Sequence, residues 1–264
     1  MTQTIDLSGR TAIVTGGCRG IGRATSVLLA EHGARVFVVD VVDENEDPTT
    51  FDQLGITFLQ CDVRRESELA DVINTVVTIT GQLDILVSNA GIGMVKPVEA
   101  VTEKDWDACI DTNLKGAFFG AKHALPPMRK AGGGVIVNIS SNAGLLPRAH
   151  DPVYSISKLA LVGLTRSLGL CLAPDRIRVN AVCPGPVGNT AMMDADLADA
   201  ADPEALKRQM IEASPLASAW NRMIEPEEIA GSVLYLVSDA AVMVTGTAIG
   251  IDGGKSLGVP PRSL

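Results

Sequence analysis

Two residues suited to proton transfer, Tyr154 and Lys158, lie four positions apart in a segment whose apolar pattern predicts a helix. Residues spaced i, i+4 project from the same helix face, so the phenol and the ammonium can act together. A phenol normally ionises near pH 10, but an ammonium about 6 Å away contributes roughly 3 kcal/mol at an effective dielectric of 20. The pair therefore predicts a tyrosine with a lowered pKa that acts as a general acid or base.

Two adjacent serines, Ser140 and Ser141, follow a β-branched run at Val135–Ile139 that is typical of a buried strand. Ligands of open α/β folds bind at the carboxyl ends of parallel strands, so a hydroxyl there can hold a reacting oxygen. Tyr-x-x-x-Lys also recurs on helices by chance, and Ser-Ser before Asn142 also fits an ordinary turn. Taken singly, neither feature establishes a catalytic site.

A glycine-rich turn joins the first strand-like run, Thr11–Thr15, to an amphipathic segment. Its glycines, Gly16, Gly20 and Gly22, permit positive φ and let the backbone approach a pyrophosphate at the positive end of a helix. Asp40 ends the second run about twenty residues later, where a carboxylate can hydrogen-bond ribose hydroxyls. Together they predict a dinucleotide site, although a tight turn and a solvated strand end would look the same singly.

Short β-branched runs alternate with longer amphipathic segments along the whole chain. This order predicts right-handed crossovers and a Rossmann-type, doubly wound α/β fold, with a parallel sheet of about seven strands and helices on both faces. A single domain over residues 1–264 is expected. The expected strands are Thr11–Thr15, Arg35–Asp40, Ile56–Gln60, Leu83–Val87, Val135–Ile139, Arg178–Val182 and Ala248–Ile251.

Helix signals agree with this arrangement. Asp151 is expected to cap a helix that has Pro152 at its first position and runs to about Leu172. Pro226, followed by two glutamates, opens another helix in the same way.

Two stretches are expected to lack regular structure. Val42–Gln53 is acidic and contains a proline, so we expect a mostly irregular connection there. The longest loop is predicted from Gly185 to about Asp202, and loops of this length are usually functional or mobile.

The composition disfavours several classes of binding partner for this chain, namely nucleic acids, metal ions and membranes. A net charge of −9 without a long basic run disfavours nucleic acid as a main partner. The five cysteines form neither a C-x-x-C pair nor a metal-ligand spacing, so no disulfide framework and no metal site is expected. Met1–Arg10 is polar, and no apolar run reaches membrane-spanning length. We therefore expect a soluble, cytoplasmic protein without a membrane partner.

The motifs follow one another in an order that resembles the short-chain dehydrogenase/reductase family, in its shorter single-domain branch, over nearly the whole chain. The family's T-G-x-x-x-G-x-G turn matches Thr15–Gly22, and its adenine-contacting aspartate matches Asp62. Its N-A-G matches Asn89–Gly91, its P-G matches Pro184 and Gly185, and its closing D-G-G matches Asp252–Gly254.

The resemblance implies a catalytic set of Asn113, Ser141, Tyr154 and Lys158. Ser141 is assigned rather than Ser140 because the family's serine lies thirteen positions before its tyrosine. By this resemblance, Tyr154 exchanges a proton with the substrate oxygen and Ser141 polarises that oxygen. Lys158 lowers the tyrosine pKa and binds the nicotinamide ribose, and Asn113 holds a water molecule in the proton relay.

The resemblance also implies NAD(H), and Asp40 favours it over NADP(H) because a carboxylate opposes a 2′-phosphate. Arg19 is the counterweight, since a basic side chain in the glycine turn can neutralise that phosphate. Ser88 replaces the first Asn of the family's N-N-A-G, and Thr190 lies further from Pro184 than the family's threonine. The implied cofactor-binding residues are Thr15, Gly16, Cys18, Arg19, Gly20, Ile21, Gly22, Asp40, Asp62, Val63, Asn89, Ala90, Gly91, Tyr154, Lys158, Pro184, Gly185, Val187 and Thr190.

A substrate cover is expected over residues 186–223, where Met223 stands near a position that is often glycine in the family. Its apolar residues fit a pocket wall and an ordinary core about equally well. They are Met192, Met193, Leu197, Met210, Ile211, Leu216 and Trp220. His150 fits either the substrate entrance or a surface loop, and the role of Arg148 stays open. The expected substrate-binding residues are Ser141, Ala143, His150, Tyr154, Met192 and Met193.

The expected function is NAD(H)-dependent interconversion of a small secondary alcohol and a ketone, including cyclic and largely apolar ones. The alternative is a non-catalytic NAD(H)-binding regulatory or scaffold protein of the same fold. An enoyl reductase or a sugar-nucleotide epimerase would have a different Tyr to Lys spacing or a longer substrate domain. The family further suggests a homotetramer, formed through helices near Lys104–Lys130 and Pro152–Leu172.

Overall fold

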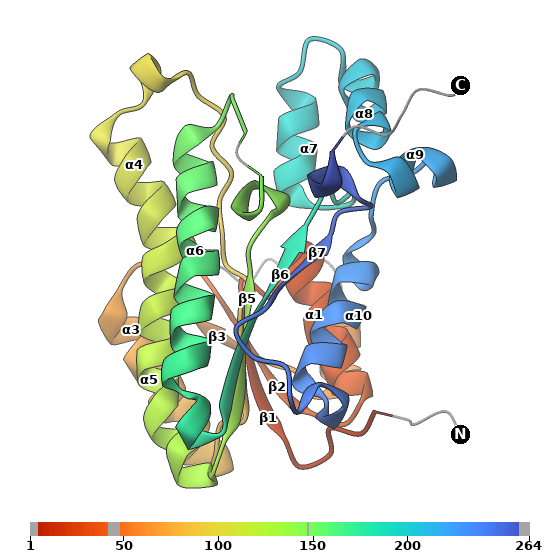
Figure 1. The fold of residues 1–264 in the computed structure, drawn as a ribbon. Coiled ribbons are helices and arrows are strands. Elements are labelled where there is room, and N and C mark those ends of the chain that lie inside the picture. Colours follow the sequence, from red (N-terminus) through yellow and green to blue (C-terminus); the bar gives the residue numbers. More distant parts are fainter. Residues whose placement is uncertain (1–4, 42–47, 147, 259–264) are drawn as a thin grey trace.

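The computed structural model describes residues 5–41, 48–146 and 148–258, and a single sheet forms its centre. The strands are β1 (Thr11–Thr15), β2 (Arg35–Asp40), β3 (Thr57–Gln60), β4 (Ile85–Ser88), β5 (Gly134–Ile139), β6 (Ile177–Pro184) and β7 (Ala248–Ile251). Their order in the seven-stranded sheet is β3-β2-β1-β4-β5-β6-β7, and every neighbouring pair is parallel (Figure 1).

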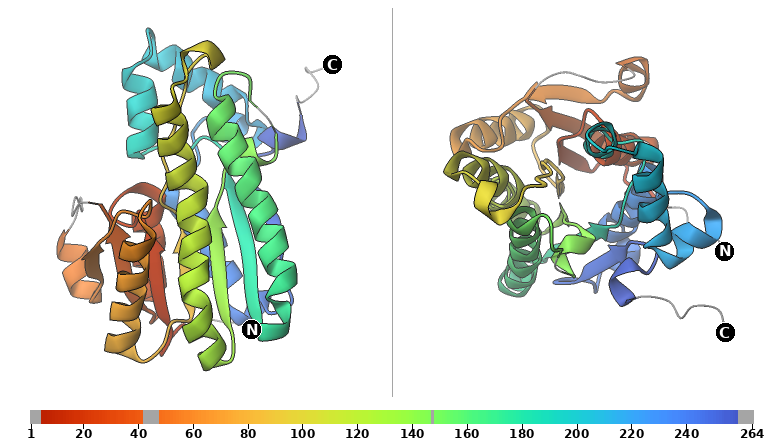
Figure 2. Two further views of the ribbon diagram at one scale, coloured as in Figure 1. Left: turned by 90° about the vertical axis from the view of Figure 1, so that its left-hand side faces the viewer. Right: turned by 90° about the horizontal axis from the view of Figure 1, so that it is seen from above.

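Helices cover both faces of this sheet (Figure 2). They are α1 (Gly20–Glu31), α2 (Pro48–Leu54), α3 (Glu66–Thr80), α4 (Glu103–Ile110), α5 (Gly116–Ala131), α6 (Pro152–Cys171), α7 (Ala191–Ala198), α8 (Pro203–Glu212), α9 (Pro215–Trp220) and α10 (Pro226–Val237). The predicted Rossmann-type, doubly wound α/β fold is therefore confirmed.

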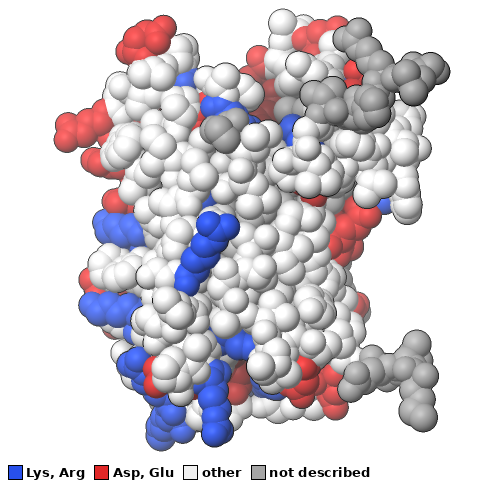
Figure 3. All heavy atoms as spheres, in the orientation of Figure 1, with Lys and Arg blue, Asp and Glu red and all other residues white. Residues whose placement is uncertain are grey.

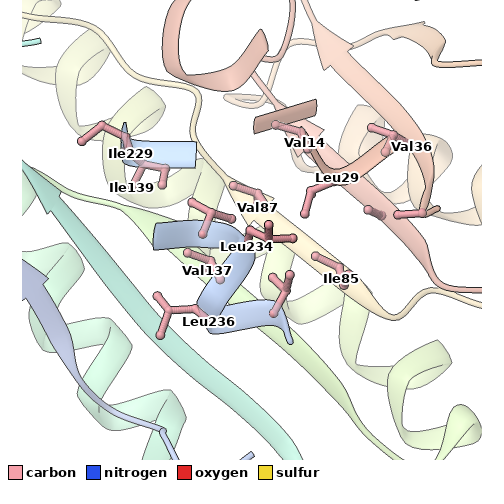
Figure 4. Packing of buried hydrophobic residues seen from close by; sticks show 14 of the residues in the cluster. Val14, Leu29, Val36, Ile85, Val87, Val137, Ile139, Ile229, Leu234 and Leu236 are labelled. Atoms are coloured by element: carbon pink, nitrogen blue, oxygen red, sulfur yellow. The ribbon is translucent and has the colours of Figure 1, made fainter. Parts of the chain in front are cut away.

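The inner strands are buried on both faces, because their side chains point alternately to the two sides of the sheet and helices cover each side. The edge strands β3 and β7 are partly exposed. Val14 of β1 belongs to the cluster that also contains Leu29 of α1 and Leu234 of α10 (Figure 4). Its neighbour Ile13 belongs to the cluster on the opposite face, together with Ile73 of α3. This double coverage explains why the strands occur in the sequence as continuous apolar runs.

The predicted strand bounds differ from the observed ones by at most two residues. β1, β2 and β7 match the predicted ranges, whereas β4 begins at Ile85 and extends to Ser88. β6 continues to Pro184 because Cys183 and Pro184 pair with Gly250 and Ile251 of β7.

Two segments that were expected to be irregular contain helices. In the stretch predicted from Val42 to Gln53, α2 begins at Pro48 and buries Phe51 against the sheet, while residues 42–47 lie outside the described residues. In the predicted loop from Gly185, α7 forms where the Thr190 hydroxyl accepts a hydrogen bond from the Met193 amide. Both expectations were wrong. The buried side chain of Phe51 stabilises α2, and the cap formed by Thr190 stabilises α7.

The helices α6 and α10 begin at the predicted prolines, but their capping differs. Asp151 occupies the N-cap position of α6 without capping a backbone amide. Its carboxylate instead accepts a hydrogen bond from the Ser155 hydroxyl and pairs with Arg148. The expected cap is therefore wrong, since these side-chain partners bind the carboxylate.

From β1, the chain first adds strands on one side of the sheet, β2 and then β3, and afterwards adds β4 to β7 on the other side. The order of the strands therefore reverses between β1 and β4. The loops after β1 and β4 therefore diverge at the carboxyl edge of the sheet and leave a crevice between them, as in other doubly wound folds. In this chain those loops are the glycine turn and the segment Asn89–Gly91.

Candidate active site

A cavity of about 880 Å³ lies at this carboxyl edge. Its lining comes from the segments that follow β1 to β7 and from α6, α7 and α8. Clefts of this size and position hold cofactors and substrates in doubly wound folds. The cavity is therefore the candidate active site.

The glycine turn forms one wall and is locked to the segment after β4. The Asn89 side-chain amide donates to the carbonyl oxygens of Thr15 at 2.9 Å and of Gly16 at 2.8 Å. The Thr15 hydroxyl accepts hydrogen bonds from the backbone amides of Asn89 and Ala90. Thr15 and Asn89 thus join the two loops across the point where the winding reverses.

Gly22 is required by close packing in this turn. A Cβ atom on Gly22 would lie 2.1 Å from the Gly16 carbonyl oxygen and 2.5 Å from the Asn89 side-chain nitrogen, and these two groups hydrogen-bond with each other. We expect Gly22→Ala to lower the free energy of unfolding by about 1–3 kcal/mol, as overpacking does, and to weaken cofactor binding. Thermal melts and cofactor titration measure both effects.

Gly231→Ala on α10 is the matched control, because a Cβ atom at Gly231 meets nothing within 4 Å. Replacing glycine by alanine in a helix stabilises it by up to about 1 kcal/mol. Equal melting temperatures for the two variants would show that the packing at Gly22 is not tight.

Two carboxylates, Asp40 and Asp62, lie at one end of the cavity, where β2 and β3 end. Asp40 accepts hydrogen bonds from the backbone amides of Cys18 at 3.3 Å and Val41 at 2.8 Å, which fix its position. Asp62 pairs with Arg64 at 2.6 Å, and this hydrogen bond holds the pKa of Asp62 below its usual value. Asp40, Asp62, Arg64 and Arg19 all line the cavity.

The side chains of the neighbouring Ser140 and Ser141 contact different groups. The Ser141 side chain lies beside the Tyr154 phenol, whose pKa it lowers, and both residues line the cavity. The Ser140 hydroxyl instead donates to the backbone carbonyl oxygen of Lys158 at 2.9 Å. The structure therefore brings Ser141, and not Ser140, to the phenol.

Lys158 and Tyr154 share a helix face, as their spacing predicts. The Lys158 ammonium nitrogen lies 5.7 Å from the centre of the Tyr154 ring and donates to the Ile139 carbonyl oxygen at 3.0 Å. Burial lowers the pKa of Lys158 to about 8.

The expected lowering of the tyrosine pKa by Lys158 is not observed. Burial raises the pKa of Tyr154 above its usual value, and the hydrogen bond with Ser141 and the charge of Arg148 only partly oppose that rise. The physical reason is that the cost of removing a phenolate from water exceeds the attraction of the nearby charges.

Asn113 lies behind the cavity wall, in a π-helical turn (Asp111–Lys115) between α4 and α5. Its side-chain oxygen accepts from the Ile92 amide at 2.8 Å, and its nitrogen donates to the Ile92 carbonyl and to the Ser157 hydroxyl. A Cβ on Gly91 would lie 3.2 Å from this oxygen and 3.4 Å from the Lys158 ammonium. Asn113 thus joins the segment after β4 to α6.

Most of the predicted site residues line the cavity. The predicted residues that do so are Gly16, Arg19, Gly20, Ile21, Gly22, Asp40, Asp62, Val63, Asn89, Ala90, Gly91, Ser141, His150, Tyr154, Lys158, Pro184, Gly185, Val187, Thr190, Met192 and Met193. Thr15, Cys18, Asn113 and Ala143 do not line it, but each hydrogen-bonds with a residue that does. The Ala143 amide, for example, donates to the Ser141 hydroxyl at 3.1 Å.

The cover over the cavity is built by α7 and α8. Met193, Ile211 and Met223 form a small buried cluster beneath these helices, and Met192 and Met210 face the cavity. Leu216 and Trp220 were expected in the cover but are 63% and 66% exposed. Their helix, α9, presents them to solvent instead of to the pocket.

Several polar residues of the cavity were not assigned from the sequence, and they are Arg64, Thr112, Asn142, Arg148, Asp196, Gln209 and Lys255. Arg148 lines it from the segment before α6, Gln209 from α8, and Lys255 from the segment after β7. A signal for Lys255 exists, because it directly follows the D-G-G motif at the carboxyl edge of the last strand. Arg148 and Gln209 belong to no motif.

Within the residues that the structure describes, no helix is both long and apolar enough to cross a bilayer. The same residues contain no group of three His, Cys, Asp or Glu side chains placed to hold a metal ion.

Comparisons with known proteins agree with the fold and the site. A family model described as "Enoyl-(Acyl carrier protein) reductase" matches residues 16–256. An uncharacterized oxidoreductase of Thermotoga maritima is 39% identical over 256 residues, covering 96% of this chain and 99% of the relative. The cis-4-hydroxycyclohexanecarboxylate dehydrogenase of Sinomonas cyclohexanicum is 37% identical over 249 residues, covering 93% of this chain and 96% of the relative.

A solved structure extends this similarity to three dimensions. A protein from Sinorhizobium meliloti 1021, described as a short-chain alcohol dehydrogenase, superimposes with a TM-score of 0.89 at 39% identity, covering 97% of this chain and 100% of that one. Since fold, motif order and full-length similarity all agree, the chain is an oxidoreductase that belongs to the short-chain dehydrogenase/reductase family.

Proposed function

We propose that the protein is an NAD(H)-dependent dehydrogenase that interconverts a secondary alcohol and a ketone. The observation that carries this proposal is that Ser141, Tyr154 and the glycine turn all line one cavity, where Ser141 lies beside the Tyr154 phenol. A proton-transferring phenol, a polarising hydroxyl and a dinucleotide cradle are the three groups that this reaction requires.

The residues of the cavity fit a nicotinamide dinucleotide. Gly16 has a φ of 62°, and Gly20 and Gly22 leave no side chain between the turn and the cavity, so the backbone can approach a pyrophosphate closely. Asp40 would bind the adenosine ribose, and Lys158 would bind the nicotinamide ribose. The cofactor supplies the acceptor or donor for the hydride at the carbinol carbon.

The side chains of the chain handle the proton. In alcohol oxidation, Tyr154 takes the hydroxyl proton of the substrate, and in ketone reduction it returns a proton to the same oxygen. Ser141 holds that oxygen beside the phenol and stabilises the negative charge that develops on it. Because burial raises the pKa of Tyr154, the phenol is protonated at neutral pH and is ready to donate in ketone reduction. In alcohol oxidation the phenol must first release this proton before it can take the proton of the substrate.

The names of relatives favour a secondary alcohol as the substrate. One relative is named for a hydroxycyclohexanecarboxylate, which is a cyclic secondary alcohol. The family model is described by enoyl reduction, which acts on a carbon–carbon double bond. The side-by-side placement of Ser141 and Tyr154 fits a carbonyl or carbinol oxygen better, since two neighbouring hydroxyls can hydrogen-bond with one oxygen.

A panel of cyclic and open-chain secondary alcohols and ketones, followed by nicotinamide absorbance, tests this function. Turnover of at least one member is expected with NAD(H). Tight NAD(H) binding without turnover of any member would instead support the alternative, a binding or scaffold protein. The cytoplasmic location and the homotetramer remain predictions, and sedimentation analysis tests the latter.

The two serines provide an internal comparison for the catalytic hydroxyl. We expect Ser141→Ala to lower kcat at least about tenfold, since one hydrogen-bond donor to the reacting oxygen is lost. Ser140→Ala removes only the hydrogen bond to the Lys158 carbonyl and should cost about 1 kcal/mol of stability with little effect on kcat. The opposite ranking in steady-state kinetics would move the catalytic hydroxyl to Ser140.

A further inference from the structure

Two cations from distant parts of the chain line the substrate end of the cavity. Arg148 lies before α6, and Lys255 lies in the short helix Lys255–Leu257 after β7. The Arg148 guanidinium carbon is 5.3 Å from the centre of the Tyr154 ring, so this charge lies next to the phenol that transfers the proton. In Figure 3, basic side chains lie near the top of the molecule, between the start of α6 and the segment after β7. They are separate from the larger group of basic side chains near the bottom of the same view.

Arg148 has hydrogen-bonding capacity to spare. One terminal nitrogen pairs with Asp151, whose other oxygen accepts from the Ser155 hydroxyl. The guanidinium carries five N–H donors, and its Nε is buried without an acceptor among the described residues. Asp151 thus holds the arginine in place, and the second terminal nitrogen, which makes no hydrogen bond with the described residues, is left for another acceptor.

Lys255 is a partly buried ammonium without a carboxylate partner within 4.0 Å in the described part of the chain. Burial and the charge of Arg148 lower the pKa of Lys255, and the charges of Asp252 and Asp151 partly oppose that shift, so the two cations feel each other's field. Its neighbour Asp252 is occupied by the amides of Gly254 and Ser256. Two like charges that repel in a shared cavity are stabilised by a bound anion.

We propose that Arg148 and Lys255 bind an acid group of the substrate, so that the enzyme acts on hydroxy and oxo carboxylates in preference to neutral alcohols and ketones. The inference rests on the dehydrogenase function proposed above and adds the substrate class to it. An arginine fork and a lysine ammonium are the usual protein partners of a carboxylate. The short separation of Arg148 from Tyr154 places the acid group a few bonds from the reacting carbon.

The carboxylate of Asp196 on α7 would repel a bound acid group, so removing its charge should strengthen the binding of an acid. Asp196 lines the same cavity, and burial raises the pKa of its carboxyl while the charge of Arg148 lowers it. An ionised Asp196 would compete with the substrate for Arg148. Replacing it with the neutral isostere should therefore strengthen the preference for an acid.

The experiment compares oxo acids with their methyl esters, using 4-oxopentanoate, 5-oxohexanoate and 3-oxocyclohexanecarboxylate with NADH. We expect kcat/KM for the best acid to exceed that for its ester by at least about tenfold. Arg148→Gln and Lys255→Gln should each lower this acid-to-ester ratio about tenfold, whereas Asp196→Asn should raise it. Kinetics on the ester, which needs neither cation, report whether each variant is folded and active.

Lys130→Gln is the matched control, because Lys130 is an exposed cation at the end of α5 and does not line the cavity. A ratio that stays at the wild-type value in Arg148→Gln and in Lys255→Gln, or esters that outperform the acids in all three pairs, would overturn the acid site. Lys255→Gln keeps the test decisive if Arg148→Gln fails to fold.

Calorimetric titration of the three acids into the protein with bound NAD(H) separates this inference from the function beneath it. Acid binding that depends on Arg148 and Lys255, without turnover of acid or ester, would support the site and overturn the dehydrogenase. Turnover of the esters with no effect of either cation would do the reverse. Absence of both binding and turnover would overturn both.

Discussion

We expect Tyr154→Phe to lower kcat by about 10² to 10⁴-fold, while NAD(H) binding and folding stay close to wild type. The substitution removes the hydroxyl that exchanges a proton with the substrate and keeps the buried ring in place. The ring is 7% exposed and packs with Val153, Cys109 and Ala143, so the apolar contacts survive. Steady-state kinetics measure the loss, and cofactor titration and thermal melts measure what remains.

Tyr235→Phe is the matched control for this experiment. Tyr235 is the other tyrosine of the chain, lies on α10 with 40% of its surface exposed, and does not line the cavity. Its loss should leave kcat unchanged. Activity of Tyr154→Phe within about tenfold of wild type would remove Tyr154 from the role of general acid and base, because such groups contribute more than that.

The fold was predictable from the sequence because the strands are covered on both faces. Burial on both sides requires continuous apolar runs, and such runs as Thr11–Thr15 and Arg35–Asp40 can be recognised without knowing their neighbours. The short helix α2 was missed because it depends on a tertiary contact, the burial of Phe51 against the sheet. A local pattern does not contain that information.

The candidate site also combines residues that local spacing predicts with residues that only the folded chain brings together. Tyr154 and Lys158 share one helix, so their spacing alone places them together. Arg148 and Lys255 are 107 positions apart, and only the folded sheet brings both to one cavity. The pKa of Tyr154 was predicted with the wrong sign because the cost of burial depends on the surrounding core, which the spacing of two residues does not reveal.

We also expect a preference for NAD(H) over NADP(H) of roughly a hundredfold in kcat/KM, set by Asp40. The backbone amides of Cys18 and Val41 hold its carboxylate at the end of β2, in the cavity wall. A 2′-phosphate carries a charge of about −1.5 to −2, and unit charges about 4 Å apart repel by about 4 kcal/mol at an effective dielectric of 20. Solvent screening leaves about 3 kcal/mol of that repulsion, which gives the hundredfold factor.

Two arginines line the same end of the cavity and work against this preference. Arg64 is bound to Asp62 by a 2.6 Å ion pair, so much of its charge is already compensated. Arg19 is exposed at the glycine turn, where solvent screens it, and it must offset Asp40 before it attracts a phosphate. Asp40 therefore dominates the local field as long as it is ionised.

Asp40→Asn and Asp40→Ala together test this assignment. Both remove the charge, whereas only the asparagine keeps an oxygen that can accept the hydrogen bonds of Cys18 and Val41. If charge sets the preference, both variants should lose it to a similar extent, because the carboxylate that repels the 2′-phosphate is then gone. Glu31→Ala, an exposed acid at the end of α1, controls for the change in net charge. A wild type that prefers NADP(H), or a preference that neither Asp40 variant changes, would show that this carboxylate does not select the cofactor.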